Sequence, residues 1–112
     1  MPSHEDLVIL LAGIHVTDRN RRRAYAVAGH LVASVLKERW HGLSEHQRKI
    51  LIRDSGNRLW NGYMEKRKNE VIKPKEAADD AIFNEIAFLE QLLNPNNAKQ
   101  GLLRQLDDLE GK

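Results

Sequence analysis

Apolar residues recur along most of the chain at spacings of three and four positions, which places them on one side of an α-helix. The clearest case is the segment 18–40, where apolar residues occupy positions 24, 27, 28, 31, 32, 35 and 36. Thr17 precedes this segment as a candidate N-cap, and Gly42 follows it as a stop signal. The pattern predicts one long helix over residues 18–40.

Two pairs of residues have the spacing of a capping box, in which side chains satisfy free backbone amides at the start of a helix. Ser3 with Asp6 predicts a helix over residues 4–12. Ser44 with Gln47 predicts a second helix that starts at this pair.

The helix that starts at Ser44 is expected to end at about Arg53, because Asp54-Ser55-Gly56-Asn57 is typical of a turn. A further helix is predicted over residues 58–71, where the apolar positions are Leu59, Trp60, Tyr63 and Met64. The two helices and the turn between them give a helix-turn-helix outline.

Two more helices are predicted at the C-terminal end, over residues 75–93 and 98–110, with Asn94-Pro95-Asn96-Asn97 between them. Pro74 is well placed just before the first of these helices. Both carry a leucine-rich stripe, so we expect them to pack as an antiparallel hairpin. The same stripes could instead form the seam of a homodimer.

The composition favours helix over sheet. The chain has 15 leucines, 10 alanines and a single threonine, Thr17, and leucine and alanine are strong helix formers. A length of 112 residues fits one folded unit. The sequence therefore predicts an all-α protein, a compact bundle of about five to six helices with a C-terminal hairpin, spanning residues 1–112 as a single domain.

Several classes of protein are excluded or disfavoured by what the chain lacks. It has no cysteine, which rules out disulfides, thiolate metal sites and cysteine nucleophiles. The longest apolar run, residues 7–14, is far shorter than the roughly 20 residues that a membrane-spanning helix needs. The first residues are acidic, whereas an export signal carries positive charge. We expect a cytoplasmic protein without a membrane partner.

Charge is unevenly distributed along the chain. Residues 1–75 contain 15 Lys and Arg against 8 Asp and Glu, a net charge of +7, and residues 76–112 contain 3 against 8, a net charge of −5. The densest basic cluster lies in residues 19–23, at the expected start of the long helix. The helix dipole disfavours positive charge there, so an external partner would explain the cluster better than helix stability does.

We therefore expect a basic surface that binds an acidic protein, a ribonucleoprotein or a nucleic acid. The residues expected to form it are Arg19, Arg21, Arg22, Arg23, Arg58, Lys66, Arg67 and Lys68. A simpler interpretation is that these charges serve solubility, or pair with the acidic half within or between chains. A third is a DNA reader, whose helix would place Arg58, Asn61 and Lys66 in the major groove.

One segment resembles a known active-site helix. Residues 23–33 read Arg-Ala-Tyr-Ala-Val-Ala-Gly-His-Leu-Val-Ala, which is similar to the A-Y-H-E-A-G-H-A-V motif of FtsH-type zinc peptidases. The coinciding residues are Tyr25, Ala28, Gly29, His30 and Val32.

The two positions that carry the chemistry of that motif are changed. Ala26 replaces the first zinc-binding histidine and Val27 the general-base glutamate. The family's remaining carboxylate ligand comes from a later helix, where Asp79 or Asp80 could be compared with it. The resemblance implies a catalytically inactive zinc-peptidase-like scaffold kept for binding. Alternatively, the small residues and Gly29 merely allow close helix packing.

No other pattern predicts a catalytic or metal site. No two of the five histidines, His4, His15, His30, His41 and His46, are spaced by four residues on one predicted helix, so we expect no metal and no cofactor. The chain also lacks a nucleophile elbow and a phosphate-binding loop. We expect a non-enzymatic binding protein, with the size and composition typical of small bacterial or phage regulators and inhibitors.

Overall fold

The computed structural model describes residues 2–68 and 72–93, which form five helices. The helices are α1 (His4–Ala12), α2 (Arg22–Leu36), α3 (Glu38–His41), α4 (Glu45–Lys68) and α5 (Pro74–Leu93). The described part of the chain contains no strand, so the predicted all-α helical bundle is confirmed. The predicted helix 98–110, and with it the C-terminal hairpin, lies outside the described residues.

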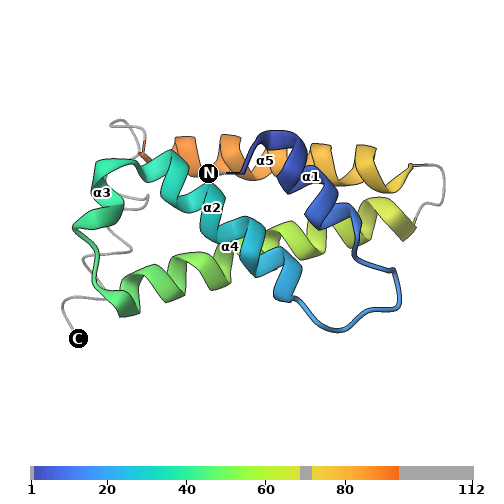
Figure 1. Ribbon diagram of the computed structural model, residues 1–112, viewed down its shortest axis with the longest axis horizontal. Helices are drawn as coiled ribbons and strands as arrows, with labels where there is room; N and C mark the ends of the chain where they lie inside the picture. The colour runs from blue at the N-terminus through green and yellow to red at the C-terminus, as the bar shows by residue number, and fades with distance from the viewer. Residues whose placement is uncertain (1, 69–71, 94–112) are drawn as a thin grey trace.

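The two longest helices, α4 and α5, run in opposite directions along the long axis of the molecule (Figure 1). Helix α2 crosses α4, and α1 packs against α5 and α2. No helix within these described ranges is long and apolar enough to cross a membrane.

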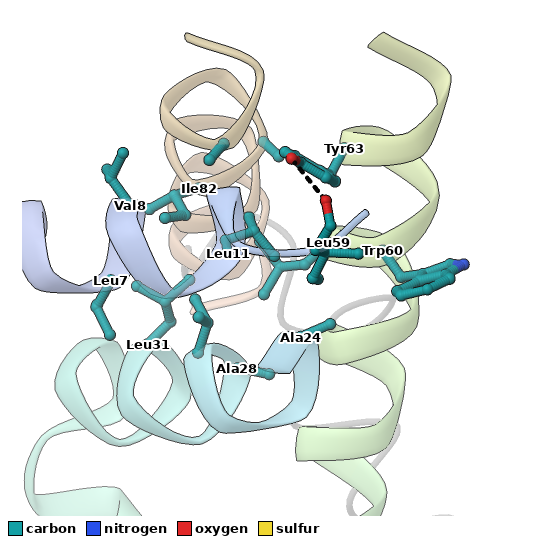
Figure 2. Close-up of a cluster of buried hydrophobic side chains, with 14 of the residues drawn as sticks. Leu7, Val8, Leu11, Ala24, Ala28, Leu31, Leu59, Trp60, Tyr63 and Ile82 are labelled. Carbon is teal, nitrogen blue, oxygen red and sulfur yellow. Dashed lines mark hydrogen bonds between the residues drawn. The ribbon is translucent and has the colours of Figure 1, made fainter. Parts of the chain in front are cut away.

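Side chains from four helices meet in one apolar core. Figure 2 shows the centre of this core, formed by Leu7 and Leu11 of α1, Ala28 and Leu31 of α2, Leu59 of α4 and Ile82 of α5. Burying each large aliphatic side chain stabilises the fold by about 1.5–3 kcal/mol. The leucine stripe of α5 belongs to the same core, since Leu89 is fully buried there. The leucine stripe of α5 therefore packs against the other helices of the same chain.

Both predicted capping boxes are present. At the start of α1, the Asp6 amide donates to the Ser3 hydroxyl (3.2 Å) and the Ser3 amide donates to the Asp6 carboxylate (3.0 Å). Before α4, the Ser44 amide donates to the Gln47 side-chain oxygen (2.9 Å) and the Gln47 amide to the Ser44 hydroxyl (3.1 Å). These local sequence signals correctly locate two of the helix starts.

The predicted turn at residues 54–57 is wrong, because α4 continues through it without a break. Ser55 and Gly56 are buried inside the bundle. A β-carbon on Gly56 would lie 3.2 Å from the α-carbon of Tyr25 and overlap the Tyr25 ring, so glycine lets α2 approach α4 closely. Because there is no turn, the predicted helix-turn-helix outline is also wrong.

The predicted helix 18–40 is also shorter than expected and divided in two. Thr17 does not cap it; instead the Arg22 amide donates to the Asn20 side chain (2.8 Å), and α2 starts at Arg22. The break comes at Lys37, whose φ of 54° is incompatible with a continuing right-handed helix. Residues 13–21 therefore form a long connection, and four of the predicted basic residues lie on it or at its end.

Candidate functional site

The connection between α1 and α2 is held in place by hydrogen bonds at its start. The hydroxyl of Tyr63, on α4, lies 3.3 Å from the Ala12 carbonyl and 3.2 Å from the Ile14 carbonyl and donates to this pair. Burial raises the pKa of the Tyr63 hydroxyl, which keeps it protonated as a donor. Further along, the Asp18 carboxylate accepts a hydrogen bond from the His15 amide (2.9 Å). The connection thus has a defined path across α4.

Arg21 closes the connection and is fixed against α4 in two ways. Its guanidinium donates to the side-chain oxygen of Asn57 (2.9 Å) and lies 5.4 Å from the centre of the Trp60 ring. The Tyr25 hydroxyl donates to the same Asn57 oxygen (2.9 Å). Figure 2 shows the Trp60 ring directed away from the labelled core side chains. Arg21 is therefore held by a neutral amide and an aromatic face.

A hollow of about 660 Å³ opens beside Arg21, between the connection and the C-terminal half of α4, and we call it the Arg21 hollow. Its lining residues are Val16, Asp18, Arg19, Arg21, Trp60, Asn61, Met64, Glu65 and Lys68. The two cations on its rim, Arg19 and Lys68, are exposed. Within the described part of the chain, neither is engaged in an ion pair or a hydrogen bond. Their charges are available to an external group.

The rest of the arginine cluster lies next to this hollow. Arg22 and Arg23 line a second, smaller hollow of about 380 Å³, which shares Asp18 with the first. Both arginines are exposed, and the Arg23 guanidinium donates to the Leu10 carbonyl (3.3 Å). The four predicted arginines of residues 19–23 thus form one basic surface over two adjacent hollows.

The remaining basic residues of the predicted surface have partners inside the molecule. The Arg58 guanidinium donates two hydrogen bonds of 2.9 Å to the buried Glu85 carboxylate. Lys66 lies 3.7 Å from the Asp80 carboxylate, and Arg67 donates to the Ile72 carbonyl (2.6 Å). Of the four basic residues predicted on α4, the structure brings only Lys68 to the Arg21 hollow.

No protein-family model matches this chain. No curated protein and no solved structure is significantly similar to it.

The peptidase-like segment forms most of α2. The positions that correspond to the catalytic residues of the motif differ in their exposure to solvent. Val27 is fully buried in the core, whereas Ala26 and His30 are exposed. The described residues contain no cluster of three or more histidines and carboxylates arranged to hold a metal ion. Asp79, one of the two acids compared with the family's third ligand, pairs instead with the His4 ring (2.6 Å).

Gly29 is not what brings the helices of this segment together. A β-carbon at Gly29 would lie 3.8 Å from the Ile52 side chain, which is ordinary contact. The glycine that close packing requires is Gly56, on the opposite helix. The prediction that Gly29 allows close helix packing is therefore wrong, and at the α2–α4 crossing Gly56 has this role.

Sequence reasoning missed the residues that fix Arg21 beside the hollow. Asn57 was assigned to a turn, and Trp60 was treated only as an apolar position of the predicted helix 58–71. The contact between Arg21 and Asn57 joins residues 36 positions apart, and no local pattern signals it. One signal was present: Asn57, Trp60, Asn61, Met64 and Lys68 recur at helical spacing, which would have placed them along one side of α4 had the helix been predicted as continuous.

Proposed function

We propose that this protein acts by stoichiometric binding and engages an acidic partner through the Arg21 hollow and the adjacent Arg22 and Arg23. The observation that carries the proposal is the meeting of Arg19 and Lys68, from segments far apart in the chain, beside an Arg21 that is already held in place. A regulatory or inhibitory role, exerted by covering a surface of the partner, is the form of action that we propose.

Two physical arguments support binding at this surface. Arg21 has lost most of its side-chain freedom to Asn57 and Trp60 before any partner arrives, so binding costs less conformational entropy. Arginine also offers several donors in a fixed plane, which suits carboxylates and phosphates. The clustered positive charge would in addition speed the approach of an acidic partner, an effect that salt screens.

The two other functions considered from the sequence receive less support. A helix-turn-helix reader needs a turn within residues 54–57 and free side chains on the second helix, but α4 is continuous there and Arg58 is paired with Glu85. The hypothesis of an inactive zinc-peptidase relative is supported only by the resemblance in sequence. Among the described residues, Ala26 and His30 make no contact that supports it further.

Affinity capture with the full-length protein as bait tests the proposal. The test variant is Arg19→Ala/Lys68→Ala, and the matched control is Arg39→Ala/Lys73→Ala, which removes two exposed positive charges that do not line the hollow. We expect a bound protein or nucleic acid that the control retains, that the test variant loses and that rising salt releases. Equal capture by both variants would contradict the proposal.

A further inference from the structure

Three of the residues that line the Arg21 hollow are apolar: Val16, Trp60 and Met64. Val16 lies on the connection with 45% of its surface exposed, although it is a large aliphatic residue. Met64 and Trp60 of α4 line the same hollow and are otherwise buried in the core. Exposed apolar surface bordered by charged groups is typical of sites that bind another protein.

Carboxylates lie among the cations of the same hollow. Asp18 and Glu65 both line it, together with Arg19, Arg21 and Lys68. Asp18 is held by the His15 amide and therefore cannot easily turn away from an approaching ligand. A continuous row of phosphates would meet these negative charges at close range, and like charges repel. A protein segment can avoid them, because its acidic side chains are separate and its other residues are neutral.

Resting on the proposed function, we infer that the Arg21 hollow binds a segment of a partner protein in which acidic residues flank a large apolar side chain. The apolar side chain packs on Val16 and Met64, and the flanking carboxylates reach Arg19 and Lys68 on the rim. Arg21 has further N–H groups besides the one that Asn57 accepts, and these can donate to a carboxylate or a backbone carbonyl. The hollow, at about 660 Å³, is within the range of roughly 300–1,000 Å³ found for ligand sites.

Selection from a random-peptide phage library on the full-length protein tests this inference without a known partner. We expect the enriched peptides to share acidic residues on both sides of a leucine, isoleucine, methionine or aromatic residue. The best peptide is then synthesised with a fluorescent label, and its affinity is measured by polarisation. A labelled single-stranded oligonucleotide serves as the second probe.

Two variants separate the apolar from the charged contribution. Val16→Ser should weaken peptide binding about fivefold by removing a contact worth roughly 1 kcal/mol, and Arg19→Ala/Lys68→Ala about tenfold. Arg39→Ala/Lys73→Ala should bind as the unmodified protein does. Val16 lies on an exposed part of the connection, so its substitution should leave the circular dichroism spectrum and the unfolding midpoint unchanged.

The possible failures are distinguishable. Enriched peptides without acidic residues, enriched peptides without an apolar residue, or no enrichment at all would overturn the inference. If the oligonucleotide instead binds and loses affinity in Arg19→Ala/Lys68→Ala, the inference fails while the proposed function stands. If neither probe depends on Arg19 and Lys68, both fail together.

Discussion

Arg21 and Arg58 are held in similar ways but differ in the charge of the group that accepts their hydrogen bonds. Each guanidinium lies over an aromatic ring, Trp60 at 5.4 Å for Arg21 and Phe88 at 4.2 Å for Arg58. Arg21 donates to the neutral amide oxygen of Asn57, whereas Arg58 donates to the carboxylate of Glu85. The charge of Arg58 is therefore paired with a carboxylate, whereas among the described residues Arg21 forms no ion pair.

This difference separates a stabilising arginine from one available for binding. Glu85 is only 3% exposed and also accepts a hydrogen bond from the Ser55 hydroxyl (2.7 Å), so its polar network is satisfied internally. A buried charge in such a network depends on its partner. The Arg21 hollow has the opposite character, with exposed cations on its rim and a neutral anchor.

The largest expected effect is the loss of stability in Arg58→Ala. This substitution leaves the buried Glu85 carboxylate with Ser55 alone. Breaking a fully buried ion pair costs about 3–5 kcal/mol, and because the Arg58 side chain is 35% exposed we expect a loss at the lower end of this range. Urea denaturation measures the change in the free energy of unfolding. Replacing both partners, as in Arg58→Met/Glu85→Leu, should recover most of the loss. A cost below about 1 kcal/mol for Arg58→Ala would show that the pair is not structural.

A smaller loss of stability is expected for Gly56→Ala, on the surface where α2 crosses α4. The added methyl group would lie 3.2 Å from the α-carbon of Tyr25, so α2 must shift, at a cost of about 1–3 kcal/mol. Gly62→Ala, in the same helix, is the control. Its methyl group would lie 3.9 Å from the Ala81 side chain, an ordinary contact. Better helix propensity should stabilise that variant by up to about 1 kcal/mol.

Because Tyr63 holds the connection that carries Arg19, its titration should affect stability at alkaline pH. Burial raises the pKa of Tyr63 above its ordinary value of 10.0. The folded state therefore retains a proton that the unfolded state releases, and stability is lost as the pH rises beyond about 10. In Tyr63→Phe this contribution is absent. The free energies of unfolding of the unmodified protein and of Tyr63→Phe should therefore converge as the pH rises above about 10. Parallel curves would contradict the conclusion that Tyr63 is the group that titrates.

The smallest effect on stability is expected for Arg19→Ala/Lys68→Ala. Both side chains are exposed on the rim of the Arg21 hollow, and such substitutions usually change stability by less than about 0.5 kcal/mol. Thermal unfolding followed by circular dichroism measures this change. A large destabilisation would mean that these residues serve the fold, as Arg58 does.

Local patterns predicted much of the fold. Helical periodicity and two capping boxes gave the all-α class, the bounds of the first helix and the start of α4. The turn at residues 54–57 was mispredicted because the role of Gly56 depends on Tyr25, which packs against it from another helix. Short-range sequence signals do not contain such a contact.

The candidate site was predicted less well for the same reason. The arginines of residues 19–23 were predicted from charge density alone; Arg19 and Arg21 line one hollow, and Arg22 and Arg23 line the adjacent one. Arg58 has the same side chain and was assigned to the same surface, yet Glu85, 27 residues further on, occupies it. What distinguishes the two arginines is the chemistry of a distant acceptor, which only the fold reveals.

The most direct test of this account converts the neutral anchor of Arg21 into a charged one. Asn57→Asp keeps Arg21, its position and nearly the same volume, and supplies a carboxylate like the one that balances Arg58. Binding of poly-L-glutamate, an acidic probe, is measured at low salt together with the free energy of unfolding. We predict that the Asn57→Asp variant is at least as stable as the unmodified protein. We also predict that its affinity for the probe is at least about fivefold lower, because the new carboxylate already neutralises the Arg21 guanidinium. Unchanged binding by a folded Asn57→Asp variant would contradict the claim that the charge of Arg21 contributes, with Arg19 and Lys68, to binding an acidic partner.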